Sequence, residues 1–396
     1  MKRVIIAVLA TVVLASASLP AAAAEPTYGF KFGGYVKADA MWDNARIYPG
    51  NYQMWVVDET EKNNAFYLTA NETRLGFDFW WDEDTYKTTA KIEFDFQGGG
   101  PATNKSNPMM RHAYIKLAAD NWALLFGQTW DIISPLNPKT VNYSVQWAQG
   151  NIGYRRPQMR VTYKIKPGEN STIKLDAGIM RNIGLDLDDN GIDDGADAGL
   201  PTFQGRFGFG TPMGEEGKLS IGVSGHYGTE KYTDPGTDEI DAMDTPSWSV
   251  NGDLAIKINK RFALLGEFFM GENLNQYLGG ILQGVDPLGN PVQSMGGWGL
   301  LQVKASDRAL LNFGYGFDDP DDSKWKAGEE AGKTYTLRDL NSEAYGNVMY
   351  SLTKNVSLMF EVGYLQTKYT YTTDGVSTTE DFDAMRFQFA VKAAIK

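Results

Sequence analysis

The segment 186–197 has the residue spacing of a calcium-binding loop. It reads DLDDNGIDDGAD, with oxygen-bearing side chains at positions 1, 3, 5, 9 and 12 and glycine at position 6. This spacing lets oxygen ligands alternate around a Ca²⁺ ion, while the glycine allows a sharp turn. The candidate ligands are Asp186, Asp188, Asn190, Asp194 and Asp197. Position 12 is Asp rather than Glu, and no flanking helices are expected. A solvated acidic loop with an Asn-Gly turn is therefore the alternative, and no other cofactor is required.

A second set of chemically active residues consists of Lys and Arg side chains that alternate with apolar ones. In a β-strand such residues share one face, because successive side chains point to opposite sides. If that face lines a water-filled channel, its cations attract anions, and Arg suits bidentate contacts with carboxylate or phosphate. The residues predicted to line the channel are Lys37, Arg74, Lys91, Arg156, Arg160, Lys174 and Arg206. The alternative is compensating ladders with Asp78, Glu93 and Asp95 across neighbouring strands, without selectivity.

Histidine and serine offer one further chemistry, which is hydrolysis. His112 and His226 are the two histidines, and Ser224 lies one strand step from His226 on the same face. An outer-membrane hydrolase needs a histidine beside its nucleophile or activated water. A pore-lining or satisfied histidine is the simpler interpretation, so no enzyme activity is predicted. The absence of Cys excludes disulfides and thiolate metal sites.

The elements that must position these residues are predicted from period-two alternation. In 86–97, for example, Ile92, Phe94 and Phe96 alternate with Lys91, Glu93 and Asp95. About sixteen such segments are found. They lie near 31–42, 65–81, 86–97, 109–118, 122–130, 153–165, 172–181, 201–210, 218–228, 246–258, 261–271, 295–304, 308–317, 339–352, 356–370 and 381–395.

The connections between these segments alternate between short and long. The long ones are 43–64, 98–108, 131–152, 182–200, 229–245, 272–294, 318–338 and 371–380. Short turns on one rim and long loops on the other are typical of outer-membrane barrels, as are aromatic residues beside the turns. We therefore predict an all-β fold: a 16-stranded antiparallel transmembrane β-barrel with short periplasmic turns and long external loops. A soluble β-sandwich would also alternate, but its polar face would not need so many charges.

The amino terminus and the net charge indicate where the protein is located and which partners it does not bind. Residues 1–24 carry Lys2 and Arg3, an apolar stretch and Ala22–Ala24, which indicates a cleaved signal peptide before a single barrel domain, 25–396. With 37 Lys and Arg against 49 Asp and Glu, the net charge is −12, which argues against nucleic-acid binding. The acids gather in the predicted loops 182–200, 229–245 and 318–338, which points to divalent cations at the cell surface.

Five segments in the first third of the chain resemble a known family. They are GGYVKADAMWD (33–43), TRLGFDF (73–79), KIEFDFQG (91–98), RHAYIKL (111–117) and LLFGQTWD (124–131). In this order they resemble Gram-negative general porins, and most closely the DcaP-type porins. The resemblance implies a trimeric, 16-stranded diffusion channel in the cell outer membrane. It also implies that the third loop, here 131–152, folds into the lumen and narrows it.

The function expected from these observations is passive diffusion of small hydrophilic solutes through an outer-membrane porin. A mildly basic constriction would favour small anions such as carboxylates or phosphate. The expected partners are outer-membrane lipid, lipopolysaccharide and two further copies of the chain in a homotrimer. Two alternatives remain: a structural or adhesive barrel that binds divalent cations and lipopolysaccharide, and an outer-membrane hydrolase.

Overall fold

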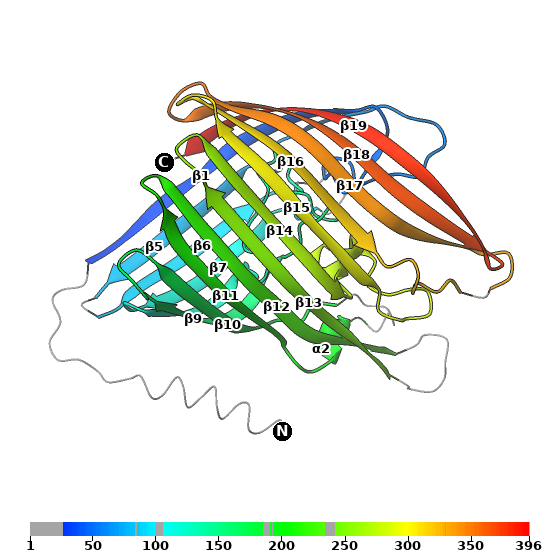
Figure 1. Cartoon of the computed structure of the whole chain (residues 1–396), viewed down its shortest axis with the longest axis horizontal. Coiled ribbons are helices and arrows are strands. Elements are labelled where there is room, and N and C mark those ends of the chain that lie inside the picture. The colour runs from blue at the N-terminus through cyan, green and yellow to red at the C-terminus, as the bar shows by residue number, and fades with distance from the viewer. Residues whose placement is uncertain are drawn as a thin grey trace.

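One antiparallel β-sheet closes on itself to form a barrel (Figure 1). The computed structural model describes residues 27–83, 85–99, 106–184, 191, 193–233, 242–328 and 330–395. The strands of the barrel are β1 (Thr27–Asp43), β4 (Ala65–Thr69), β5 (Arg74–Asp82), β6 (Lys87–Asp95), β7 (Met109–Ala118), β8 (Trp122–Trp130), β9 (Arg155–Ile165), β10 (Thr172–Met180), β11 (Thr202–Met213), β12 (Gly217–Thr233), β13 (Ala242–Lys257), β14 (Phe262–Glu272), β15 (Gln293–Lys304), β16 (Ala309–Pro320), β17 (Thr334–Ser351), β18 (Val356–Thr373) and β19 (Val376–Ile395).

The sheet is closed because β1 pairs with the last strand, β19, on one side and with β4 and β5 on the other. Every other strand pairs with its neighbours in chain order. Since β4 and β5 lie end to end beside β1, the seventeen strands described in this sheet fill sixteen positions in the wall. The predicted 16-stranded antiparallel barrel is confirmed. Closure leaves no unpaired edge in the wall, as a membrane requires.

The two faces of the wall differ as the alternation predicts. In β1, Val36 and Trp42 are exposed on the outside, whereas Lys37, Asp39 and Asp43 are buried on the inside. The outside of the other strands carries exposed apolar side chains such as Phe126, Met159, Ile221, Phe268, Phe313 and Phe360. A continuous apolar exterior around a polar interior is the arrangement of a transmembrane barrel, so its outer face contacts lipid.

The strands differ in length around the barrel. Strands β5 to β10 have 9–11 residues, whereas β12, β13 and β17–β19 have 16–20. Since roughly 9–11 residues cross the bilayer, the longer strands should extend beyond it. Figure 1 shows the long ribbons of β17–β19.

The prediction of a long loop at 371–380 was wrong, because β18 and β19 extend through most of this segment. β18 and β19 continue to a two-residue turn at Asp374 and Gly375, which both have positive φ. The ribbon there is held by hydroxyl pairs such as Thr372 with Ser377, at 2.8 Å. Water reaches both faces of this ribbon, so it carries no apolar alternation. The predicted loops 229–245 and 318–338 also contain strand residues at their ends.

Three long loops fold into the barrel, namely 44–64, 131–154 and 273–292. Loop 44–64 contains β2 (Ile47–Tyr48) and β3 (Trp55–Val56), and loop 273–292 contains the short helices η1 (Asn275–Tyr277) and η2 (Gly280–Leu282). Their apolar side chains are buried against inward residues of the wall, for example Ile47 and Val56 against Leu365. The hydrophobic core therefore lies inside the barrel. The resemblance implied this for 131–152, but the sequence did not predict it for the other two loops.

The remaining helix is α2 (Asp194–Asp197), which lies beside β12. In the part of the chain that the structure describes, no helix is long and apolar enough to cross a membrane. The signal segment 1–24 lies outside the described residues, as do the candidate ligands Asp186, Asp188 and Asn190.

Candidate channel constriction

Loop 131–154 crosses the lumen from β8 to the opposite wall. The carboxylate of Glu361 in β18 accepts hydrogen bonds from the backbone N–H groups of Val141, at 2.7 Å, and Asn142, at 3.0 Å. Near its start, Leu136 N–H donates to Glu267 Oε1 of β14 at 2.8 Å. A loop that contacts β14 and β18 while it connects β8 to β9 must run through the barrel interior. It therefore narrows the passage, as the resemblance implied.

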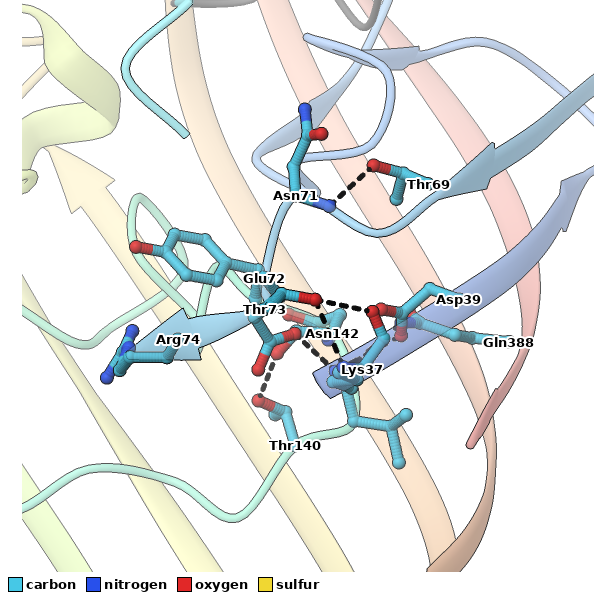
Figure 2. A network of polar contacts seen from close by, with 12 residues as sticks. Lys37, Asp39, Thr69, Asn71, Glu72, Thr73, Arg74, Thr140, Asn142 and Gln388 are labelled. Atoms are coloured by element: carbon cyan, nitrogen blue, oxygen red, sulfur yellow. Dashed lines mark hydrogen bonds and ion pairs between the residues drawn. The ribbon is translucent and has the colours of Figure 1, made fainter. Parts of the chain in front are cut away.

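Lys37 attaches this loop to β1. Its Nζ contacts the carboxylates of Glu72 and Asp39, the latter at 3.1 Å, and donates to the carbonyl oxygen of Val141 at 2.7 Å. Figure 2 shows Lys37 between these two acids, with Gln388 of β19 donating to Asp39 Oδ1 at 2.8 Å. These contacts hold the loop against β1. Because only 2% of Lys37 is exposed, it presents little positive charge to the passage.

Arg156 has a similar place at the other end of the loop. Its Nε lies 3.0 Å from Asp131 Oδ1, and its Nη2 donates to the carbonyl oxygen of Gln276 at 2.9 Å. Its guanidinium lies 4.1 Å from the ring centre of Tyr277 in η1. This fully buried arginine joins β9, loop 131–154 and loop 273–292. We therefore assign it a structural role ahead of contact with solutes.

The acidic side chains of the inner wall lie beneath these loops. Besides Glu361 and Glu267, Asp318 accepts hydrogen bonds from Ser294 Oγ, at 2.7 Å, and from Ile281 N–H, at 3.3 Å. Glu343 accepts a hydrogen bond from Gln53 of loop 44–64. All four are buried. These carboxylates accept hydrogen bonds from backbone and side-chain groups of the loops and of the wall. Because they are buried, a solute in the aqueous passage does not contact them.

Arg74 and Lys91 lie on β5 and β6 and are partly exposed. Arg74 contacts Glu93 at 3.4 Å and Asp95 at 3.1 Å. Lys91 contacts Asp78 at 3.4 Å and Glu93 at 3.1 Å. These are the cross-strand ladders that the alternative interpretation expected. The two cations therefore act with their acids and not as isolated charges.

Arg206 forms a bidentate pair with Asp253 across the intervening strand β12. The two hydrogen bonds measure 2.9 and 2.7 Å. The pair lies over Gly222 of β12, where a Cβ atom would come within 2.3 Å of the Arg206 guanidinium and 2.4 Å of the Asp253 carboxylate. A glycine at 222 is thus the local sequence feature that allows this ion pair.

Arg160 and Lys174 lie on β9 and β10 below the loop. Arg160 donates through Nη2 to the carbonyl oxygen of Trp130, and among the described residues it has no carboxylate within ion-pair distance. It borders two cavities, of about 230 Å³ and about 180 Å³. Lys174 contacts Asp176 at 2.9 Å and keeps 42% of its side chain exposed. Lys174 is thus the most exposed of the predicted residues, and Arg160 is the one without an ion pair among the described residues.

Sequence reasoning missed Arg111 and Arg155. Arg111 Nε donates to Asp95 Oδ2 at 2.6 Å, and its guanidinium lies 4.9 Å from the ring centre of Tyr143 in the loop. Arg155 stacks 3.5 Å from the ring centre of Trp130. The register shifts at the bulge where Glu93 faces His112 and the next residue faces Met110, so Arg111 and His112 are both buried. A strict period of two cannot predict that outcome.

The two histidines have structural neighbours. His112 Nδ1 lies 3.0 Å from Thr129 Oγ1. The ring nitrogens of His226 contact the hydroxyls of Ser249, at 2.7 Å, and Ser247, at 3.0 Å, and its ring stacks on Tyr277. Among the described residues, Ser224 Oγ has no hydrogen-bond partner, so the pair considered for hydrolysis is not formed. His226 instead fixes helix η1 to β12 and β13.

In the described part of the acidic loop 182–200, the carboxylate of Asp193 is hydrogen-bonded to the loop backbone. It accepts hydrogen bonds from Gly184 N–H, at 3.0 Å, and Ala196 N–H, at 3.1 Å, and pairs with Arg181 at 2.6 Å. Burial raises the pKa of Asp193, but these hydrogen bonds outweigh burial and hold the pKa below its usual value. Asp194 and Asp197 lie in α2, next to this carboxylate. Calcium binding at 186–197 stays a prediction.

No protein-family pattern and no characterised relative matches the sequence. Solved structures do resemble the fold. The outer membrane channel DcaP of Acinetobacter baumannii shares 21% identity and a TM-score of 0.68, over 93% of this chain and 97% of that one. An anion-selective porin from Comamonas acidovorans shares 11% identity and a TM-score of 0.57, over 93% and 100%. A trimer form of OmpT from Vibrio cholerae shares 12% identity and a TM-score of 0.56, over 93% of this chain and 100% of that one.

These likenesses confirm the fold that the five sequence segments indicated. The chain has the fold of a 16-stranded barrel, and it resembles the DcaP structure along nearly its whole length rather than in the first third alone.

Proposed function

We propose that this barrel is a porin of the Gram-negative outer membrane that lets small hydrophilic solutes diffuse passively. The observation that carries the proposal is a closed barrel with a polar inner face. Loop 131–154 crosses its lumen and narrows it. A channel needs such an interior, because solutes must exchange part of their hydration for protein groups. The likeness to an outer membrane channel and to a porin supports it.

We further propose a preference for small anions such as carboxylates or phosphate. Glu361, Glu267, Asp318 and Glu343 are covered by loops, so they present little negative charge to a passing solute. Arg160 and Lys174 remain accessible on the facing wall. The Comamonas acidovorans structure, named as an anion-selective porin, has the same fold.

Bilayer recording tests both parts of this proposal. The purified protein in a planar bilayer should give discrete conductance steps and, in a salt gradient, a reversal potential of the sign set by anions. Arg160→Ala should move that potential toward cations. Arg181→Ala, which removes an arginine 58% exposed in an external loop, should leave it in place.

Two results would contradict the proposal in different ways. A silent bilayer would favour the alternative of a structural or adhesive barrel that binds divalent cations and lipopolysaccharide. Conductance steps with a cation-selective reversal potential would keep the porin and remove the anion preference.

A further inference from the structure

We infer that the lumen contains a binding site for a doubly charged oxyanion of the phosphate type at its short-turn end, where it shares Arg160 with the cavity beneath loop 131–154. The inference rests on the proposed function, since the anion must enter the lumen. The site is a cavity of about 180 Å³ beside β7, β8, β9 and β10. Small side chains make room for it, among them Ala118, Ala119 and Ala123. The turn 119–121 borders its short-turn end.

Four cations from three strands line this cavity. They are Lys116 of β7, Arg160 and Lys164 of β9, and Lys174 of β10. Each lies on the inward face, because each is an even number of residues from a buried inward neighbour on its strand, such as His112, Gln158 or Asp176. Lipid therefore cannot supply the ligand, and a solute in the lumen can.

Two of these lysines are directly opposed in the sheet. Lys164 and Lys174 are register partners of β9 and β10, and like charges in that position destabilise a sheet. Asp176 compensates Lys174 at 2.9 Å and also accepts a hydrogen bond from Thr162 at 2.6 Å. Within the described residues, Lys116 and Lys164 have no carboxylate within 4.0 Å, and the buried Arg160 Nε has no hydrogen-bond partner. Donors and positive charge are thus left available to a ligand.

The charge of the site selects the class of ligand. The four cations face two acids, Asp120 in the cavity lining and Asp176 beside Lys174, which leaves a net charge of +2. A tetrahedral dianion offers four oxygens to donors that come from several directions. Ammonium groups act as separate point charges and suit this arrangement, whereas one planar carboxylate is matched best by a single guanidinium.

Equilibrium dialysis of radiolabelled inorganic phosphate against the detergent-solubilised barrel tests the site. Wild type should bind phosphate saturably, with one phosphate per chain. The double variant Lys164→Gln with Lys174→Gln should raise the apparent Kd at least about tenfold. The matched control is Lys218→Gln with Lys257→Gln, a second pair of directly opposed lysines near the same rim but outside this cavity. It should change the Kd less than about twofold.

Two outcomes would overturn the site. One is the absence of saturable binding by wild type, and the other is equal weakening by both double variants, which would indicate diffuse attraction to a basic lumen. Folding of each variant is checked by its thermal unfolding, and neutralising opposed lysines should not lower the Tm. Because dialysis needs no current, a silent bilayer with retained binding would reject the porin and keep the site.

Discussion

Arg156 is a buried cation at the place where β9, loop 131–154 and loop 273–292 meet. The guanidinium is fully buried with Asp131, the carbonyl oxygen of Gln276 and the ring of Tyr277. Removing one partner of such a pair leaves the other charged group buried without compensation. This costs about 3–5 kcal/mol. We therefore expect Arg156→Ala to lower the free energy of unfolding by about that amount, measured by urea unfolding in detergent.

The control for this prediction is the exposed pair of Arg46 and Glu59. Arg46 keeps 58% of its side chain exposed, so Arg46→Ala should cost at most about 1 kcal/mol. Equal losses of unfolding free energy in the two variants would show that the buried contacts of Arg156 add no stability beyond that of an exposed ion pair.

At the same scale, the sequence predicts the strand face of a residue but not what covers it. Alternation places Lys37 and Arg156 on the polar face, and both side chains do point inward, yet both are buried beneath loops. Burial by a distant loop depends on contacts more than a hundred residues apart, such as Lys37 with Val141, and leaves no local pattern. Arg111 was missed because a bulge breaks the period of two.

Glu361 makes the largest set of hydrogen bonds among the side chains that hold the tip of loop 131–154 on the far wall. Glu361 accepts four hydrogen bonds, from Val141 N, Asn142 N, Asn142 Nδ2 and Asn347 Nδ2. Glu361→Gln replaces one accepting oxygen by an NH₂ group that faces donors, which costs about 1–3 kcal/mol. We expect this loop to leave the wall more often and the mean single-channel conductance to rise.

Planar-bilayer recording of Glu361→Gln measures this effect. The matched control is Glu330→Gln, which changes a carboxylate that is 69% exposed in an external loop. A conductance equal to that of wild type in both variants would mean that Glu361 does not hold the loop in place.

The strands could be predicted from the sequence, whereas the inner loops could not. Membrane-spanning strands carry apolar residues at every second position, because lipid lies on one face and water or loops on the other. Loops 44–64 and 273–292 bury residues such as Val56 and Leu274 without any period. The ends of β18 and β19 were missed for the opposite reason, since water lies on both of their faces.

At the scale of the whole molecule, six consecutive strands of 9–11 residues form one short wall of the barrel. The short wall, β5–β10, ends near the membrane surface and carries exposed apolar side chains such as Ile115 and Phe126. Exposed apolar side chains allow copies of the barrel to pack side by side, and we propose that the short wall forms the interface of a homotrimer. A trimer form of one structure with this fold is consistent with the proposal.

Paired substitutions test this interface. Ile115→Arg on β7 should abolish the trimer on native electrophoresis, because it places a charge in the interface. Phe313→Arg on β16 changes a similarly exposed residue outside the short wall, 51% against 57%, and should leave the trimer intact. Loss of the trimer in both variants, or in neither, would contradict the assignment.

Closure of the wall also dictates the order of assembly. Asp43 in the first strand and Arg386 in the last are hydrogen-bonded neighbours 343 residues apart. The barrel cannot seal until the final strand is available, so the growing chain presents two open strand edges until then. Such edges pair readily with other chains, and contacts this distant form slowly. The unfolded chain must therefore be kept from pairing with other copies until the 20 residues of β19 are available. Pairing of β19 with β1 then removes the open edges at which chains could aggregate.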